Sequence, residues 1–587
     1  MHFTRDEHIQ FLQDELRAQT EAFRQKMDIS AVNLLVDKET LFVAQFLKFE
    51  EGEMILKFSN NRLLPRQGEY LYCFSVPKEL RDYRNWGNRT YGDLIKEKYN
   101  YSEVVCLWQT STDDKDYSIA GFRGIDIEFA SDIQEAEGRI LILGPNKPPF
   151  EYLTNLQKIV KRTDNEAVNK ILDQDFQFAD WTPYLLDNKR NIPDFIFNQL
   201  ELQDKLIIQG PPGTGKTYLM AEICARLCNE GKSVLVTALT NRALIEMIEK
   251  PALKNLLSEH KIFKTKLSVD EVKANKDLQQ TKEISPLPGK LILSTFYITS
   301  GEASQVSNIP PFDYVIVDEA SQALLAMFAG GCLLGKKNIW IGDTKQLPPI
   351  VTLGEDKVNR KNYGALVDGL KALSDNTVLP IFQLTESYRL TERATNYSGF
   401  FYRDSLKSKS KKNIRLNFPE LVEGPGKYLH PKGGPTLIKI PLPIGDLKPS
   451  GGLQMVTELV MHLLDINEDL HISVLCKFTE TTRGLQKHIF QAVGYPKNIL
   501  VDTVEKVQGL TTDICIYFIP NTSYHRSLDC RLFNVATSRS KRHTIIIADK
   551  SILIRNKFDH EVNFFLRKLN EDFSFEFKNG KEIKLLG

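Results

Sequence analysis

The sequence predicts an α/β protein with two consecutive α/β domains behind an N-terminal accessory region. Its 587 residues exceed what one compact core usually holds, since domains average about 100–200 residues. After Lys205, short apolar runs alternate with helical patterns, which is typical of a buried parallel sheet between helices. Before Lys205 the pattern differs, because it is first helical and then rich in short β-type runs.

The N-terminal region, residues 1–180, is expected to combine helices with a small β-rich unit. Residues 1–26 place apolar side chains at helical spacing, which predicts an amphipathic helix. Residues 30–127 alternate short apolar runs with polar turns, which predicts a small barrel or a twisted antiparallel sheet. Residues 131–180 return to a helical pattern. The many aromatic side chains of this region offer stacking platforms for a single strand or, more commonly in a small barrel, form its core.

The two α/β domains are expected at residues 181–380 and 381–587. The strand-like runs of the first are LIIQG, SVLVTA, LILST, YVIVDEA and NIWIGD. Those of the second are PTLIKI, ISVLC, NILVDTV, ICIYFI and HTIIIAD, in a set that begins near Phe382. Residues 250–290 are polar, Lys-rich and helical in character, which predicts a surface insertion in the first domain.

Composition excludes several classes of protein. Because 76 Lys+Arg balance 75 Asp+Glu, affinity for nucleic acid cannot come from bulk positive charge, although a basic groove is compatible with this balance. The polar start lacks a secretory core, and the apolar stretch 323–335 is shorter than the ~20 residues of a membrane span. A cytoplasmic protein with no membrane partner is therefore expected. The cysteines form no CxxC pairs, so neither a zinc nor a disulfide framework is expected.

The strongest motif is the octapeptide GPPGTGKT, which lies between an apolar strand and a helix. Its residues are Gly210, Pro211, Pro212, Gly213, Thr214, Gly215, Lys216 and Thr217. Glycines let backbone N–H groups turn inward around phosphate oxygens, and the helix N-terminus adds partial positive charge. We expect Lys216 to reach the β- and γ-phosphates of a nucleotide and the Thr217 hydroxyl to bind Mg²⁺.

Two further motifs follow apolar strands and place polar side chains at the same sheet edge. Asp318 and Glu319 end the run YVIVDEAS, so Asp318 is expected to hold Mg²⁺ and Glu319 to deprotonate the attacking water. Gln346, in GDTKQLPP, could bind the γ-phosphate and that water. The alternative for this segment is an ordinary Gly-Asp turn. A phosphate loop followed by paired carboxylates favours nucleotide hydrolysis over storage.

Taken in order, GPPGTGKT, VDEAS and GDTKQLPP resemble the superfamily 1 helicases, in particular the Up-frameshift-like branch of superfamily 1B. The similarity continues through TALTNRALIEM, LILSTF, LTESYR, VDTVEKVQG and RLFNVATSRSKRHTIIIAD, and covers approximately residues 205–550. The resemblance implies two tandem RecA-like P-loop domains, with a helical stalk and a small barrel before them. It also implies ATP as the nucleotide and Mg²⁺ as its metal.

The resemblance assigns further residues to the nucleotide. Arg389 and Arg539 would reach the γ-phosphate from the second domain and stabilise the transition state, Tyr388 would stack on the adenine, and Gly509 would lie at the interdomain cleft together with Gln508. The segment after Gly509 departs from the family pattern, because it reads Leu-Thr-Thr where a Glu is usual.

The resemblance also implies a track for single-stranded DNA or RNA across both domains. Its contacts would come from Thr240, Asn241, Thr295 and Thr503, whose hydroxyl and amide groups grip phosphates without reading sequence. The basic run 406–415 is either a further backbone contact or a solvated loop. The N-terminal region is a candidate surface for protein partners.

The expected function is an ATP-dependent helicase or translocase, with 5′-to-3′ movement implied by the resemblance. Two alternatives stay open. One is a nucleic-acid-stimulated ATPase switch that remodels complexes without unwinding duplexes, which the missing Glu after Gly509 favours. The other is a P-loop kinase or another metabolic phosphotransferase, which the paired arginines disfavour. The sequence does not discriminate DNA from RNA.

Overall fold

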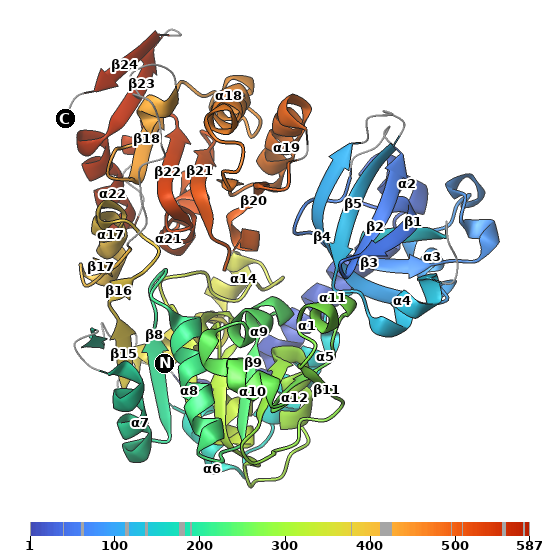
Figure 1. Cartoon of the computed structure of the whole chain (residues 1–587), viewed down its shortest axis with the longest axis vertical. Helices are drawn as coiled ribbons and strands as arrows, with labels where there is room; N and C mark the ends of the chain where they lie inside the picture. The colour runs from blue at the N-terminus through green and yellow to red at the C-terminus, as the bar shows by residue number, and fades with distance from the viewer. Residues whose placement is uncertain are drawn as a thin grey trace.

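The computed structural model describes most of the chain and has three parts (Figure 1). The described residues are 2–38, 40–59, 64–111, 117–134, 139–174, 182–187, 191–376, 379–410, 425–494, 496–507, 509–554, 559–578 and 581–585. A small barrel projects to one side, and two α/β domains lie one above the other beside it. The predicted α/β class is confirmed.

The barrel is closed and antiparallel, in the strand order β1-β2-β5-β4-β3-β6. Its strands are β1 Phe42–Glu50, β2 Glu53–Ser59, β3 Tyr70–Ser75, β4 Tyr101–Ser111, β5 Tyr117–Arg123 and β6 Ile140–Pro145. Short helices α2 Ala31–Val36, α3 Tyr91–Lys96 and α4 Ile127–Gln134 accompany them. The barrel prediction is confirmed, but the helical prediction for residues 131–180 is wrong at β6, which closes the barrel by pairing with both β1 and β3. Closure leaves no unpaired strand edge.

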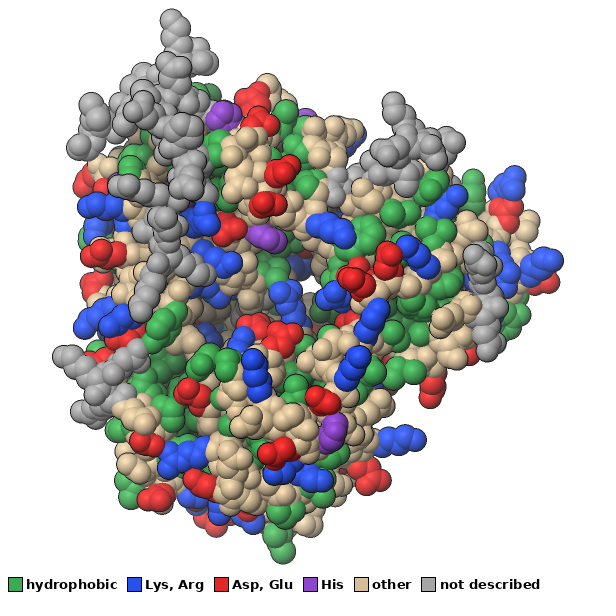
Figure 2. All heavy atoms as spheres, viewed as in Figure 1, with side chains coloured by type: hydrophobic (Ala, Val, Ile, Leu, Met, Phe, Trp, Pro, Cys, Tyr) green, Lys and Arg blue, Asp and Glu red, His purple; other side chains and the backbone are tan. Residues whose placement is uncertain are grey.

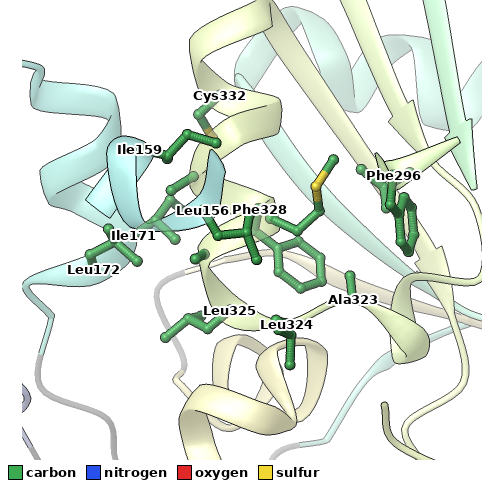
Figure 3. Packing of buried hydrophobic residues seen from close by; sticks show 14 of the residues in the cluster. Leu156, Ile159, Ile171, Leu172, Phe296, Ala323, Leu324, Leu325, Phe328 and Cys332 are labelled. Carbon is green, nitrogen blue, oxygen red and sulfur yellow. The ribbon is translucent and has the colours of Figure 1, made fainter. Parts of the chain in front are cut away.

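Three N-terminal helices attach this region to the first α/β domain. Helix α1, Arg5–Met27, begins at a capping box formed by Thr4 and Glu7, as the amphipathic pattern predicts. Helices α5, Phe150–Val160, and α6, Glu166–Leu172, pack against α12, Phe296–Ala303, and α13, Leu325–Leu334. Figure 3 shows side chains of α5 and α6 against α13: Leu156, Ile159, Ile171, Leu172, Phe328 and Cys332. These helices therefore share one core with the first domain.

The first sheet has nine strands in the order β11-β10-β12-β9-β13-β14-β8-β15-β7, and its neighbouring strands pair in parallel. They are β7 Tyr184–Leu186, β8 Lys205–Gln209, β9 Val234–Ala238, β10 Ile262–Thr265, β11 Gln279–Thr281, β12 Leu291–Thr295, β13 Phe312–Val317, β14 Gly335–Gly342 and β15 Ile381–Leu384. Its other helices are α7 Ile192–Leu202, α8 Lys216–Asn229, α9 Asn241–Ile248, α10 Lys254–Ser258, α11 Val269–Ala274, α14 Glu355–Arg360, α15 Gly364–Val367 and α16 Gly369–Asp375. Parallel strands place the loops after β8, β13 and β14 at one edge.

This sheet differs from the prediction in two places. Residues 250–290, expected as a helical surface insertion, add β10 and β11 to the sheet edge. A buried ion pair of 3.0 Å between Lys264 and Glu271 fixes that segment. Strand β15 lies beyond the boundary expected at residue 380, yet it pairs with β8 in the first sheet.

The second sheet has seven strands in the order β20-β19-β21-β22-β18-β23-β24. They are β18 Gly434–Lys439, β19 Ile472–Cys476, β20 Ile499–Thr503, β21 Thr512–Ile519, β22 Ser540–Ala548, β23 Ser574–Lys578 and β24 Lys581–Leu585. Its helices are α18 Ser450–Ile466, α19 Thr479–Val493, α20 Tyr524–Ser527, α21 Cys530–Thr537 and α22 His560–Asp572. The connection between the sheets contains β16 Glu386–Ser387, α17 Glu392–Ser398 and β17 Lys407–Ser408. Within the described ranges, no helix has both the length and the apolar character needed to span a membrane.

Candidate functional site

The glycine-rich loop joins β8 to α8 and encloses a lysine. Gly213 and Gly215 adopt φ values of +73° and +81°, which favour glycine. Gly210 is required by close approach, because a Cβ there would lie 2.1 Å from Cγ of Lys216. The Lys216 ammonium lies within the loop and donates to the carbonyl of Gly210 at 2.6 Å. Burial lowers the pKa of Lys216, because its positive charge is poorly solvated there.

Two carboxylates lie at the end of β13. Asp318 is buried, and its Oδ1 accepts a hydrogen bond from the backbone N–H of Glu319 at 2.8 Å. Glu319 adopts a left-handed φ of +48°, so the chain turns sharply out of the strand. Burial raises the pKa of Asp318 to about 6. Burial, and then the charge of Asp318, raise the pKa of Glu319 to about 7.

The donor set beside the loop fits a divalent cation. Asp318 supplies a buried carboxylate, and Thr217 supplies a hydroxyl in the first turn of α8. Mg²⁺ prefers such oxygen ligands and keeps several waters. A cation at this point would offset the desolvation that raises the pKa of both carboxyl groups. Asp318 and Thr217 are therefore the residues that could hold Mg²⁺.

A further carboxylate, that of Asp343, is buried and holds the loop after β14 in place. Asp343 Oδ1 accepts hydrogen bonds from Gln209 Nε2 at 2.6 Å and from the Lys345 N–H at 3.0 Å. Its Oδ2 accepts from Gln346 Nε2 and from the Tyr402 hydroxyl, each at 2.7 Å. The loop that carries Gln346 is thus held against both β8 and a residue of the connection between the sheets.

Arg539 crosses from the second domain to this loop. Its Nη2 donates to Gln346 Oε1 at 3.2 Å, and its Nε donates to the carbonyl of Val535 at 3.0 Å. Arg389 Nη1 donates to the carbonyl of Ser538 at 3.3 Å. Burial, and then the charge of Arg539, lower the pKa of Arg389 to about 9. Burial likewise lowers the pKa of Arg539. Arg389 and Arg539 are therefore two cations held close together where the two domains meet, a region that we call the seam.

The segment around Arg389 lies directly on the glycine-rich loop. The Tyr388 N–H donates to the carbonyl of Gly213 at 2.8 Å, and Ser387 Oγ donates to that of Pro212 at 2.9 Å. A Cβ at Gly213 would lie 2.4 Å from Cβ of Arg389. Because this segment follows β15 of the first sheet, Arg389 belongs to the connection between the domains, whereas Arg539 comes from the second domain itself. Tyr388 is half exposed beside the loop.

Glycine 509 brings the second domain to the catalytic carboxylate expected in the first. It has a φ of +86°, and a Cβ there would lie 3.7 Å from Glu319 Oε1. Gln508, expected beside Gly509, lies outside the described residues. The second half of the basic run 406–415, a separate candidate for backbone contact, also lies outside them.

Three cations therefore converge beside two carboxylates. In the part of the chain that the structure describes, the hydrogen bonds made by Lys216, Arg389 and Arg539 all go to neutral oxygen atoms. Desolvated cations with neutral partners favour an added anion, since an anion restores the stabilisation lost with water. The arrangement is suited to a polyphosphate with a divalent cation.

The expected strand contacts occupy the carboxyl ends of strands. Thr240 caps α9 by accepting the N–H of Ala243, and Thr295 pairs in register with Ala238 of the adjacent strand. Thr295 and Thr503 are buried at 7% exposure each, whereas Asn241 is exposed. Thr240, Asn241 and Thr295 therefore share one edge of the first sheet, and Thr503 ends β20 in the second.

The barrel contacts both α/β domains. On the first domain, Asp270 Oδ1 accepts the N–H of Gly124 at 3.0 Å. On the second, Arg66 Nη1 lies 4.0 Å from Asp502 Oδ1, and the Lys497 ammonium lies 4.3 Å from the centre of the Trp108 ring. Figure 2 shows a narrow opening between the barrel and the two α/β domains.

The barrel aromatics divide between core and surface. Phe74, Trp86 and Tyr91 are fully buried and Tyr72 nearly so, which means that these four aromatic side chains form the core instead of stacking platforms. Tyr70, at 57% exposure, and Tyr99, at 66%, remain exposed.

Sequence reasoning missed four residues of the seam. The motifs predict no separate role for Asp343, Gln209, Tyr402 or Asn534. The one signal for these residues in the sequence is a polar side chain beside a motif in a segment expected to be buried. Their contacts are not visible locally, because each partner lies far away in the sequence. Gln209 and Asp343 are 134 residues apart, Tyr402 and Asp343 are 59 residues apart, and Asn534 and Tyr402 are 132 residues apart.

Comparisons with known proteins match both α/β domains. Two family models, each described as an AAA domain, match residues 196–352 and 369–551. The DNA replication ATP-dependent helicase/nuclease DNA2 of Saccharomyces cerevisiae is 30% identical over 242 residues, which are 40% of this chain and 16% of that protein. An uncharacterized ATP-dependent helicase of Methanocaldococcus jannaschii is 25% identical over 44% of this chain and 39% of its own. A regulator of nonsense transcripts 1 homolog of Drosophila melanogaster is 23% identical over 61% of this chain and 34% of its own. The matched part thus spans less than half of each of these relatives.

Proposed function

Because this chain belongs to the superfamily 1 helicases, as its two AAA domains and its relatives show, we propose that it hydrolyses ATP to move along single-stranded nucleic acid. The observation that carries the proposal is a group of three buried cations, Lys216, Arg389 and Arg539, whose hydrogen bonds go to neutral oxygen atoms. This group lies beside the carboxyl groups of Asp318 and Glu319. A triphosphate between the domains would meet all of these groups at once.

Each residue of the seam has a role in hydrolysis under this proposal. The glycine-rich loop and Lys216 bind the phosphates, and Asp318 with Thr217 would hold Mg²⁺, which neutralises charge on phosphate oxygens when bound. Glu319 accepts the proton of the attacking water, and a pKa near 7 suits a general base at neutral pH. Gln346 orients that water.

The remaining groups stabilise the transferred phosphoryl group and the base. Arg389 and Arg539 offset charge that develops on the γ-phosphate, an effect worth roughly 10³–10⁵ in rate for such arginines. Tyr388 stacks on the adenine beside the glycine-rich loop. Gly509, close to Glu319, lets the second domain approach without a side chain in the way.

Hydrolysis is coupled to domain closure in this proposal, because Arg539 reaches Gln346 only from the second domain. Alternate closing and opening would move Thr503, on the second domain, relative to the strand contacts of the first domain, which are Thr240, Asn241 and Thr295. A phosphate backbone bound by both domains would then advance in one direction. The opening between barrel and domains supplies a passage for the strand (Figure 2). We propose 5′-to-3′ movement on DNA or RNA, and strand displacement on 5′-tailed but not 3′-tailed duplexes would support it. The projecting barrel is the candidate surface for protein partners (Figure 1).

The second candidate function is an ATPase switch that clamps or remodels nucleic-acid complexes without unwinding. The sequence Leu510-Thr511-Thr512 favours it, because the carboxylate usual after Gly509 in the family is replaced by uncharged side chains. Strand-stimulated hydrolysis without duplex unwinding would select this candidate.

The primary test compares ATP hydrolysis with no polymer, with single-stranded DNA and with single-stranded RNA, using Lys216→Ala as the blank. We expect at least one polymer to stimulate hydrolysis, and Lys216→Ala to abolish it under every condition. Hydrolysis that is indifferent to both polymers would contradict the proposal and favour a metabolic phosphotransferase.

A further inference from the structure

Three side chains from beyond the first sheet donate hydrogen bonds to the loop that carries Gln346. The Tyr402 hydroxyl donates to Asp343 Oδ2 at 2.7 Å, Asn534 Nδ2 donates to the carbonyl of Lys345 at 2.8 Å, and Arg539 donates to Gln346 Oε1. We propose that Tyr402 and Asn534 are positioning residues that orient Gln346 for hydrolysis when the domains close. This inference rests on the proposed ATPase function.

The orientation of the Gln346 amide is set by the chemistry of its two neighbours. The Asp343 carboxylate only accepts hydrogen bonds, and the Arg539 guanidinium only donates them. Gln346 must therefore direct Nε2 toward Asp343 and Oε1 toward Arg539, which are the contacts found at 2.7 and 3.2 Å. Any change that shifts the Asp343 carboxylate consequently shifts the Gln346 amide.

Tyr402 holds that carboxylate in place. Its hydroxyl accepts a hydrogen bond from Asn534 Nδ2 at 2.8 Å while it donates to Asp343. Burial raises the pKa of Tyr402 well above its ordinary value, so the phenol stays a donor at working pH. Tyr402, Asn534 and Asp343 are almost completely buried, and hydrogen bonds in such an environment are stronger than in water.

Tyr402 packs in the apolar core of the second domain, and Asn534 lies on α21 of that domain. Tyr402 lies in the same apolar cluster as Phe533, the residue before Asn534 on α21. That helix also contacts the first domain through an ion pair of 2.5 Å between Arg531 and Asp368. Separation of the domains would therefore remove the bonds from Tyr402 and Asn534 together and release the Gln346 loop.

The chain offers a matched control in Tyr397. It is buried in the same cluster as Tyr402, and its hydroxyl donates to the Asp572 carboxylate at the same distance, 2.7 Å. Asp572 lies on α22 of the second domain, so Tyr397→Phe loses a hydrogen bond of the same length to a carboxylate without affecting the seam.

The experiment measures kcat and KM for ATP in wild type, Tyr402→Phe and Tyr397→Phe, with the stimulating polymer present. We expect Tyr402→Phe to lower kcat by at least about tenfold with KM within about twofold, since a lost bond to a charged group costs that much. Tyr397→Phe should keep both constants within about twofold of wild type. Asn534→Ala should repeat the loss of kcat, and this second variant serves if Tyr402→Phe does not fold.

Equal kcat values for Tyr402→Phe and Tyr397→Phe would refute the inference, as would a change in KM alone. If wild type itself hydrolysed no ATP with any polymer, the proposed function would fail and this inference with it. The two failures are distinguished by the wild-type rate.

Discussion

Replacing Glu319 with Gln should stabilise the protein at alkaline pH while it abolishes hydrolysis. The carboxyl group of Glu319 has a pKa of about 7 in the folded chain against an ordinary value of 4.5, chiefly because it is buried. The folded state thus holds this proton more tightly than the unfolded state does. Stability is therefore lost as pH rises from about 4.5 through about 7, because the folded chain must then carry a poorly solvated charge.

The size of this effect follows from the pKa difference. The ordinary pKa of 4.5 and the folded-state pKa of about 7 differ by about 2.5 units. Each unit corresponds to about 1.4 kcal/mol, so the cost approaches about 3.5 kcal/mol above pH 8. Glutamine has the same shape and no charge, so Glu319→Gln should recover up to that amount at pH 8. At pH 4.5 and below the difference should largely vanish.

Denaturant unfolding at pH 8 and pH 4.5, without nucleotide or divalent cation, measures the difference directly. Glu249→Gln is a suitable control, because Glu249 is exposed on the first domain and its change should stay within about 0.5 kcal/mol. A Glu319→Gln variant that is no more stable than wild type at pH 8 would refute the reasoning that Glu319 is held at an energetic cost for catalysis.

Two further substitutions test the seam and the sheet edge. Arg539→Ala should lower kcat by at least about 10³-fold while nucleotide affinity changes little, since its charge acts mainly in the transition state, and Arg539→Lys should not restore the rate; a loss of affinity without a loss of kcat would argue against this role. Lys264→Met should cost about 3–5 kcal/mol in unfolding free energy, because it leaves the Glu271 carboxylate buried without its partner. The double replacement Lys264→Met with Glu271→Leu should recover most of that loss, and equal instability of the single and double variants in denaturant unfolding would contradict the explanation.

Local patterns predicted the parts of the site that local geometry builds. The glycine-rich loop needs only a strand, a turn and a helix in succession, and residues 205–229 supply all three. Asp318 and Glu319 follow a short apolar run that has the pattern of a buried parallel strand, so their place at the sheet edge followed from the fold class.

Long-range pairing explains what the sequence did not predict. Strand β6 closes the barrel only because β1 and β3 present free edges, and those edges come from residues far earlier in the chain. Strand β10 contains Lys264, and a lysine in a short run does not suggest a buried strand. Lys264 is buried only because it forms an ion pair with Glu271. The hydrogen bonds of Tyr402 and Asn534 likewise depend on two domains meeting, and no local pattern encodes that contact.

A crystal structure with Mg²⁺, ADP and aluminium fluoride, which imitates the transferred phosphoryl group, tests the seam most directly. We predict that the fluoride would lie within hydrogen-bonding distance of Lys216 on one side and of Arg389 and Arg539 on the other, with Glu319 facing the attacking water. Arginines pointing away from the fluoride in a closed arrangement of the domains would contradict hydrolysis at a shared site.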